Sequence, residues 1–433
     1  MRNDLAAPHR RRWCQQAAAW AATAALGPAA RLSLAATRAP SPEAPRLVVV
    51  LLRGGLDGLA AVVPVGDPAL AAARAALVPE RSLPMDGQFA LHPALAQVHA
   101  MYGRGEALPV HAVGLPYRER SHFDAQNLLE SGAERPFALD TGWLGRALAL
   151  DGRHTGIALQ PALPLLLRGH AGVDTWAPSR LPEPGHELLE RLRLLYAGDP
   201  PLAAALSRAQ ALREGGMLPS PDAGMAGSGT MAGAGANANG GNGGNGANSA
   251  NSAYSAEGLA RQAAAFLARP DGPQVAVLEM GGWDTHAGQG ADTGTLANQL
   301  GRLDAALGAL RDGLSAPDAQ GAWQRSAVLV VTEFGRTVAV NGTGGSDHGS
   351  GAAAFVLGGA VAGGRVLADW PGLAPAQRAD GRDLRATLDV RALFLTLLHQ
   401  HLRLPLGGLH ERVLPATAGL KLLPLLRGLN HAW

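Results

Sequence analysis

The 433-residue chain contains a single cysteine, Cys14, and few aromatic side chains. Cys14 lies close to the N-terminus, so the rest of the chain can form no disulfide and offers no thiolate for metal binding or covalent catalysis. Aromatic residues make up only 4% of the sequence, but hydrophobic residues make up 47%, which is enough for a sizeable core. Any polar site must therefore be built from oxygen and nitrogen atoms.

The sequence also lacks a strong excess of charge of either sign. The formal net charge is +2, and residues 1–36 hold five arginines and one aspartate. Without those residues the balance becomes slightly negative. This composition predicts no binding to nucleic acid and none to an anionic membrane surface.

Residues 1–36 have the layout of an export signal. The arginines Arg10–Arg12 precede an apolar run, Ala17–Ala30, and a site of small residues follows at Ser33-Leu34-Ala35. Paired arginines before a modestly hydrophobic run are typical of a twin-arginine (Tat) signal, so we expect the Tat translocase to export the protein to the periplasm or the exterior. An uncleaved anchor is the alternative. The run is shorter than the ~20 apolar residues of a membrane span and contains Gly27-Pro28, so no stable span is expected.

Apolar runs followed closely by glycine recur along the chain after a linker at residues 37–45. These runs lie at residues 47–52, 108–114, 274–282, 326–335 and 352–359. Such runs are typical of strands that are buried on both faces of a parallel sheet. Helical patterns lie between them, at residues 94–102, 296–314 and 386–401. The alternation predicts one α/β domain over residues 46–433, a three-layer sandwich with a central, mostly parallel sheet.

Residues 215–255 differ from the rest of this predicted domain. They are rich in glycine, alanine, asparagine and serine and carry almost no charge. This composition predicts a flexible, low-complexity insertion within the domain. A calcium-binding glycine repeat would need regular aspartates, which the segment lacks.

Carboxylates and imidazoles follow the ends of several predicted strands. Ligands of open α/β sheets bind beyond the carboxyl ends of the strands, so we expect these side chains to meet there. The candidate metal ligands are Asp57, Asp284, His286, Glu333, Asp347 and His348. Ligands of these types suit a divalent metal, Zn, Mn, Mg or Ca, with one or two ions bound.

A further segment, "RSHFDAQNLLESG", places Ser121, His122 and Asp124 at the start of a predicted helix. Serine at a helix start is by default an N-cap. A nucleophile can occupy the same position, because a helix N-terminus stabilises anions. Arg118, Arg120 and Arg336 could neutralise such an anion, and the catalytic candidates are Ser121 as nucleophile and Arg336 as anion-binding residue. The alternative is that Ser121 only caps the helix and a metal-bound water attacks. There is no G-x-S-x-G motif, which disfavours a serine hydrolase triad.

Together these motifs resemble a known family. The segments are "LVVVLLRGGLDGL", "LHPAL", "VHAVG", "RSHFDAQNLLESG", "GGWDTH", "VVTEFGRTVAVNGTGGSDHG", "GGRV" and "WPGL". In their order and number they resemble the DUF1501 family of exported bacterial proteins, over roughly residues 46–404. That family is similar to the alkaline phosphatase and sulfatase superfamily, whose members have a mostly parallel α/β sheet and typically hold two metal ions beside a nucleophile.

The resemblance implies roles for particular residues. It implies Asp57 as the ligand after the first strand, Ser121 at the nucleophile position, and Asp284, His286 and His348 as ligands of one metal. Where the superfamily carries an Asp-His pair, this sequence has Glu333-Phe334. The sequence has no C-x-P-x-R motif, which excludes a formylglycine sulfatase.

Two functions remain open on these grounds. The first is an exported metal-dependent hydrolase that acts on a phosphate or sulfate ester of a small molecule or a polymer. The second is a non-catalytic exported protein of the cell envelope that keeps the fold and binds a polymer.

Overall fold

The structure, a computed structural model, describes residues 43–170, 172–178, 184–215 and 255–428. The predicted signal, most of the linker, and the predicted insertion apart from its two end residues lie outside the described residues. The described residues belong to one compact unit, Pro40–Trp433. None of the described helices is long and apolar enough to cross a membrane.

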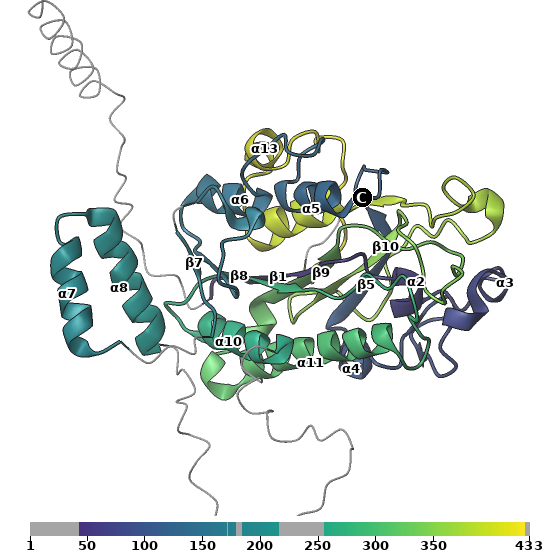
Figure 1. The fold of residues 1–433 in the computed structure, drawn as a ribbon, viewed down its shortest axis with the longest axis horizontal. Helices are drawn as coiled ribbons and strands as arrows, with labels where there is room; N and C mark the ends of the chain where they lie inside the picture. The colour runs from purple at the N-terminus through teal and green to yellow at the C-terminus, as the bar shows by residue number, and fades with distance from the viewer. Residues whose placement is uncertain (1–42, 171, 179–183, 216–254, 429–433) are drawn as a thin grey trace, which may run out of the picture. The chain divides into compact units, whose positions relative to one another are not determined.

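A mixed sheet of eight strands forms the centre of the described chain (Figure 1). Its strands are β1 (Arg46–Leu52), β5 (Ala107–Gly114), β6 (Gly156–Ala158), β7 (Val173–Thr175), β8 (Val275–Met280), β9 (Ser326–Thr332), β10 (Ala352–Leu357) and β11 (Leu388–Asp389). Their spatial order is β11-β5-β10-β9-β1-β8-β6-β7. Within this sheet β10 runs antiparallel to its neighbours β5 and β9, and the other pairings are parallel. The prediction of a mostly parallel sheet is confirmed.

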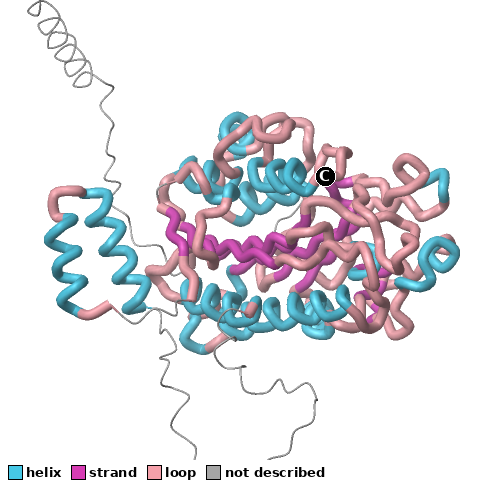
Figure 2. Tube along the Cα trace, in the orientation of Figure 1, coloured by secondary structure: helices cyan, strands magenta, loops and turns pink. Residues whose placement is uncertain are grey.

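Helices cover both faces of the sheet, and Figure 2 shows the strands as the middle layer. On one face lie α4 (Ala96–Gly103), α10 (Ala256–Ala268) and α11 (Thr295–Ser315). On the other lie α5 (His122–Ser131), α6 (Trp143–Asp151) and α12 (Val390–Thr396). Successive residues of β1 alternate between the two: Val48 and Val50 join the first core, and Leu47 and Val49 join the second. This burial on both faces explains the continuous apolar runs of the sequence.

The remaining elements are shorter or lie outside this sandwich. The helices are α2 (Gly58–Ala61), α3 (Leu70–Arg74), α7 (His186–Tyr196), α8 (Pro200–Gly215) and α13 (Leu406–Gly408), and a small sheet has the order β2 (Val62–Val63), β4 (Ala90–Leu91), β3 (Leu83–Pro84).

The five predicted strands and the helices predicted at 94–102 and 296–314 are confirmed within a few residues. The helix predicted over 386–401 is wrong at its start. Leu388–Asp389 pairs with β5 as β11, and the Asp389 side chain accepts a hydrogen bond from the Arg391 N–H, so α12 begins only at Val390. Pairing with the sheet and a capping carboxylate override the helical pattern here.

Because β1, β8 and β9 are parallel, the connections that leave their carboxyl ends lie at one edge of the sheet. The backbones come very close there. A Cβ on Gly54, which follows β1, would lie 2.7 Å from the Asp284 amide nitrogen, which follows β8. Gly54 also has a φ of 122°, which L side chains rarely adopt. A glycine at this position lets the two connections touch.

Candidate metal centre

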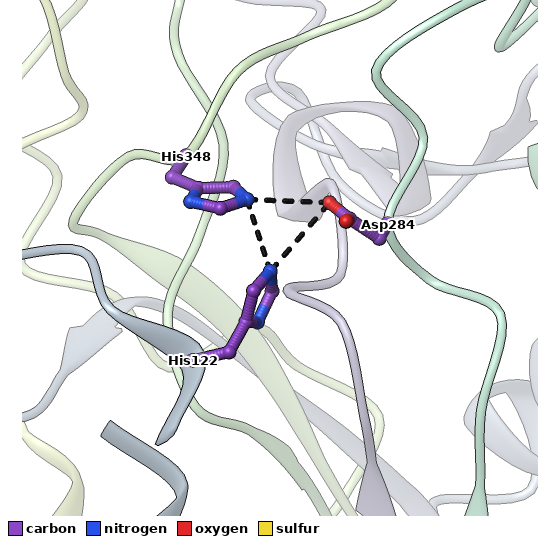
Figure 3. A group of neighbouring side chains, drawn as sticks. All are labelled: His122, Asp284 and His348. Atoms are coloured by element: carbon purple, nitrogen blue, oxygen red, sulfur yellow. Dashed lines mark hydrogen bonds and ion pairs between the residues drawn. The ribbon is translucent and has the colours of Figure 1, made fainter. Parts of the chain in front are cut away.

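Three imidazole rings and one carboxylate meet at this edge. His122 is the first residue of α5, Asp284 and His286 follow β8, and His348 lies between β9 and β10. Figure 3 shows the ring nitrogens of His122 and His348 turned toward the Asp284 carboxylate. The His122 and His348 Nε2 atoms are 2.9 Å apart, and they lie 3.7 and 3.3 Å from Asp284 Oδ1. The His286 Nε2 lies 2.9 Å from His348 Nε2 and 3.0 Å from the same Asp284 oxygen.

These separations fit a metal ion. A tetrahedral shell with metal–ligand bonds of 2.0–2.2 Å keeps neighbouring ligand atoms about 3.4 Å apart. Among the described residues, His122, Asp284 and His348 form a group whose ligand atoms all lie within 4.8 Å of one another. His286 lies directly beside this group. We call these four residues the histidine cluster.

The other nitrogen of each ring is fixed by an acceptor. His122 Nδ1 lies 2.8 Å from Glu333 Oε1, His286 Nδ1 lies 3.0 Å from Asp347 Oδ1, and His348 Nδ1 lies 3.0 Å from the Arg120 carbonyl oxygen. Carbonyl and carboxylate oxygens accept, so each Nδ1–H donates. In the neutral rings the Nε2 atoms therefore carry bare lone pairs that face one another and Asp284. Such a group of acceptors could hold a cation, and this Nδ1 arrangement is typical of metal-binding histidines.

The charges around the cluster favour an ionised Asp284 and a polarised His122. Burial opposes ionisation of Asp284, but the hydrogen bond and the positive charge of the Arg336 guanidinium, together with the neighbouring imidazoles, hold the pKa of this carboxyl below its usual value. The hydrogen bond to Glu333 raises the pKa of His122. Burial, together with the nearby His122, lowers the pKa of His348. In the metal-free cluster His122 is therefore more basic than His348.

Glu333, a predicted ligand, lies behind His122 instead of beside it. Its side chain is fully buried. Its Oε1 accepts hydrogen bonds from His122 Nδ1, the Gly54 N–H at 2.8 Å and Gln126 Nε2 at 3.0 Å, and its Oε2 accepts one from the Thr332 hydroxyl. These donors occupy both carboxylate oxygens. Glu333 therefore orients the His122 ring and links α5 to the ends of β1 and β9.

Asp347 has the same relation to His286. Its Oδ1 accepts from His286 Nδ1 and, at 3.0 Å, from Asn341 Nδ2. Asn341 Nδ2 also donates to the His286 carbonyl. Asp347 thus supports the ring and the backbone of the segment that carries it.

Arg336, the predicted anion-binding residue, is fully buried. Its guanidinium donates to the carbonyls of Gly54, Gly55, Trp283 and Ser346 and to Asp284 Oδ1. The guanidinium therefore binds the three connections of the site together and touches a ligand, and its N–H groups are used within the protein.

The structure does not bring Asp57 to the histidine cluster. Its Oδ1 caps α2 by accepting from the Leu59 and Ala60 N–H groups, and its Oδ2 accepts from Arg74 and, at 2.7 Å, from Gln289 Nε2. Asp57 and Arg74 are both fully buried, so they form a buried ion pair beneath the site.

Ser121 is the N-cap of α5. Its Oγ accepts a long hydrogen bond of 3.5 Å from the Asp124 N–H. Sequence reasoning searched the strand ends for ligands and weighed Ser121, but it gave no ligand role to His122. A signal was present in the sequence, because His122 directly follows Ser121 at the start of the predicted helix.

The protein is thus an α/β protein with a cluster of histidine and aspartate that is compatible with a divalent metal. The chain belongs to the family described as "Protein of unknown function (DUF1501)", whose model matches residues 102–417 and so includes the whole histidine cluster. Among solved structures it is similar to the phosphonate monoester hydrolase of Agrobacterium radiobacter. The identity is 13% and the TM-score 0.35, over 83% of this chain and 74% of that one. No curated protein matches the sequence significantly.

Proposed function

We propose that the protein is an exported metal-dependent hydrolase that acts on a phosphate or sulfate ester. One observation carries the proposal: three Nε2 lone pairs converge on Asp284 Oδ1 while every Nδ1 is held by an oxygen acceptor. A bound divalent cation supplies Lewis-acid polarisation of an ester oxygen.

The ligand types favour a transition metal over Mg or Ca. Imidazole nitrogens suit Zn and other transition metals, whereas Mg and Ca prefer shells made of oxygen. His122, His286 and His348 would hold the cation together with Asp284. Glu333 and Asp347 would keep two of these rings in the tautomer that leaves Nε2 free. Zn is therefore the expected metal, with Mn, which prefers oxygen ligands, second.

The surroundings of the cluster support an anionic substrate. The α5 helix, ten residues long, begins at His122, and the positive end of its dipole favours negative charge at this point. The Asp284 side chain is 46% exposed, so solvent and a substrate reach the cluster. Ser121 remains the candidate nucleophile, because its hydroxyl stands at the same helix end as His122; this hydroxyl accepts one long hydrogen bond from the Asp124 N–H and also interacts with the Tyr117 hydroxyl.

The test measures metal content and hydrolysis on the same purified full-length protein. We expect bound Zn or Mn by elemental analysis, and turnover of aryl phosphates or sulfates that chelation abolishes. His348→Ala should lose both, whereas His99→Gln, which changes a histidine bonded to the Pro84 carbonyl, should lose neither. Bound metal without turnover of any ester would favour the non-catalytic, polymer-binding alternative. The absence of metal from wild type would refute the proposal.

Export by the Tat translocase belongs to the same proposal. It rests on the arrangement of Arg10–Arg12 before the apolar run, which lies outside the described residues. Replacing the three arginines with lysine should leave the protein in the cytoplasm, as fractionation would detect. Export that is unaffected by this change would contradict the Tat route.

A further inference from the structure

His348 differs from the other two rings because its Nδ1 is held by a backbone carbonyl rather than by a carboxylate. That carbonyl belongs to Arg120, which has a φ of 58°. Residues other than glycine rarely adopt this left-handed conformation, because the Cβ approaches the backbone. A non-glycine residue held there next to a site needs contacts that outweigh the strain.

The shortest of those contacts come from Asp383, and a longer one of 3.5 Å joins Arg120 Nη2 to Asp380 Oδ2. The Asp383 Oδ2 accepts from Arg120 Nε at 2.9 Å and from Arg120 Nη2 at 2.7 Å. The same oxygen accepts from the Ser350 hydroxyl at 3.0 Å, and Ser350 is two residues beyond His348. One carboxylate thus holds both chain segments that form the hydrogen bond between His348 Nδ1 and the Arg120 carbonyl.

Asp383 is itself rigidly held. It is fully buried; its Oδ1 lies at an ion-pair distance of 3.2 Å from Arg382 Nη1 but accepts no hydrogen bond. Its backbone exchanges hydrogen bonds with Ala379 in both directions and bridges Thr337, which lies in the connection that carries His348. A buried, charged carboxylate held in this way restricts the positions of the side chains that donate to it.

We infer that Asp383 is a positioning residue of the metal centre. By holding Arg120 in the left-handed conformation, Asp383 aims the Arg120 carbonyl at His348 Nδ1. The carbonyl fixes the His348 tautomer and turns Nε2 toward Asp284. Asp383 touches none of the ligand atoms and acts through Arg120 and Ser350. The inference rests on the proposed metal binding and goes beyond it.

The test compares Asp383→Asn with wild type. Zn affinity is measured by competition with a chromophoric chelator, and the visible absorption of the Co(II)-loaded protein reports the ligand set. We expect Zn affinity to fall about 10- to 100-fold, as is typical when the partner of a ligating histidine is lost, and the Co(II) spectrum to change.

Asp67→Asn is the matched control. Asp67 is another buried carboxylate, but it accepts from Trp370 Nε1 and the Leu373 N–H, both at 2.9 Å, rather than from the site. This variant should lower the melting temperature and leave the Zn affinity and the Co(II) spectrum unchanged. A purely structural role for Asp383 predicts that the two variants behave alike.

Arg120→Gly removes the side chain that Asp383 binds but keeps the backbone carbonyl that holds His348. This variant tests the inference even if Asp383→Asn fails to fold. Glycine adopts a φ of 58° without strain but has no guanidinium to bind Asp383. We expect a loss of Zn affinity similar to that of Asp383→Asn, with no further loss in the double variant, because the two residues act as one unit. Wild-type affinity in either single variant would overturn the inference and leave the metal site standing. A wild-type protein that binds no metal would overturn both.

Discussion

Two sets of histidines in this molecule use the same side chain in opposite ways. His92 and His111 are buried in the body of the protein, and the backbone matches both of their nitrogens. In His111, Nε2 donates to the Val62 carbonyl at 3.0 Å and Nδ1 accepts from the Ala112 N–H at 2.8 Å. In His92, Nε2 donates to the Ala291 carbonyl and Nδ1 accepts from the Ala94 N–H. In each ring of the histidine cluster, Nδ1 has an oxygen acceptor, whereas Nε2 faces another ring nitrogen and the Asp284 carboxylate.

This difference separates a structural histidine from a ligand. A buried ring whose donor and acceptor are both used needs no further partner and stays neutral. Burial lowers the pKa of His111 to about 4, and it has the same effect on the buried His401, whose Nε2 donates to the Arg46 carbonyl. A ring with one nitrogen held and the other facing further acceptors can take a cation at the second nitrogen. Burial or proximity alone would not distinguish the two sets, but the pattern of hydrogen-bond partners does.

The largest effect should come from replacing a ring of each set. His348→Ala removes a nitrogen from the cluster, so Zn affinity should fall by well over about 100-fold, more than when only the partner of a ligand is lost. His111→Ala should instead lower the free energy of unfolding by about 2–4 kcal/mol, because it leaves a cavity and an unpaired Val62 carbonyl. Chelator competition and chemical denaturation of both variants would measure this contrast. A loss of Zn affinity in folded His111→Ala would break the comparison.

Asp57→Asn tests whether Asp57 belongs with the structural groups. The change leaves the fully buried Arg74 without its anion, so the free energy of unfolding should fall by about 3 kcal/mol. Zn affinity should not change, because the contacts of Asp57 are with Arg74, Gln289 and α2. Denaturation and chelator competition check both halves. Reduced Zn affinity in this variant would restore Asp57 to the set of ligands predicted by the resemblance.

The buried rings also predict how stability depends on pH. The pKa of His111 and His401 is about 4 in the folded protein and about 6.5 in the unfolded chain, so the unfolded chain takes up protons first as the pH falls. The stabilisation is complete above pH ~6.5 and is lost as the pH falls toward 4. At pH 5 the free energy of unfolding should be lower by about 2 kcal/mol for each of the two rings than at neutral pH. Denaturation of metal-free protein between pH 7.5 and 5 would measure the loss. In His111→Gln the free energy of unfolding should fall less steeply with decreasing pH. The same pH dependence as wild type would contradict the low pKa of His111.

The smallest effect should come from the residue that supports His122. Glu333→Gln keeps an oxygen acceptor for His122 Nδ1 but removes the charge, so Zn affinity should fall only about tenfold. The pKa of His122, which Glu333 raises, should fall in the metal-free variant, as NMR titration of the ring would detect. Gln126→Ala, which removes another donor to the same carboxylate, is the control and should leave the charge effect intact. An unchanged His122 pKa in Glu333→Gln would argue against this coupling.

Much of the fold follows from the sequence, because strands buried on both faces leave continuous apolar runs. This predicts five strands, β1, β5, β8, β9 and β10. It also predicts the sheet edge at which the polar residues that follow these strands lie. The start of α12 could not be predicted, because it depends on the pairing of Leu388 with Val113 in β5, a contact between distant segments.

The candidate site was predictable in part. The structure brings Asp284, His286 and His348 together as their strand-end positions suggest. Glu333 and Asp347 lie behind the rings, and spacing alone cannot separate a ligand from the residue that orients it. Asp57 lies apart, because Arg74 and Gln289 bind it through contacts that no local pattern reveals.

The parallel pairing of β1 with both β8 and β9 determines when the histidine cluster can form during folding. Residues 46–52 must find partners more than 200 positions away before the connections that carry Asp284 and His348 share an edge. Pairings of such long range form late, since the chain must first close large loops. The histidine cluster therefore does not exist in a half-finished molecule. A metal ion at the proposed site would therefore bind after these strands have paired.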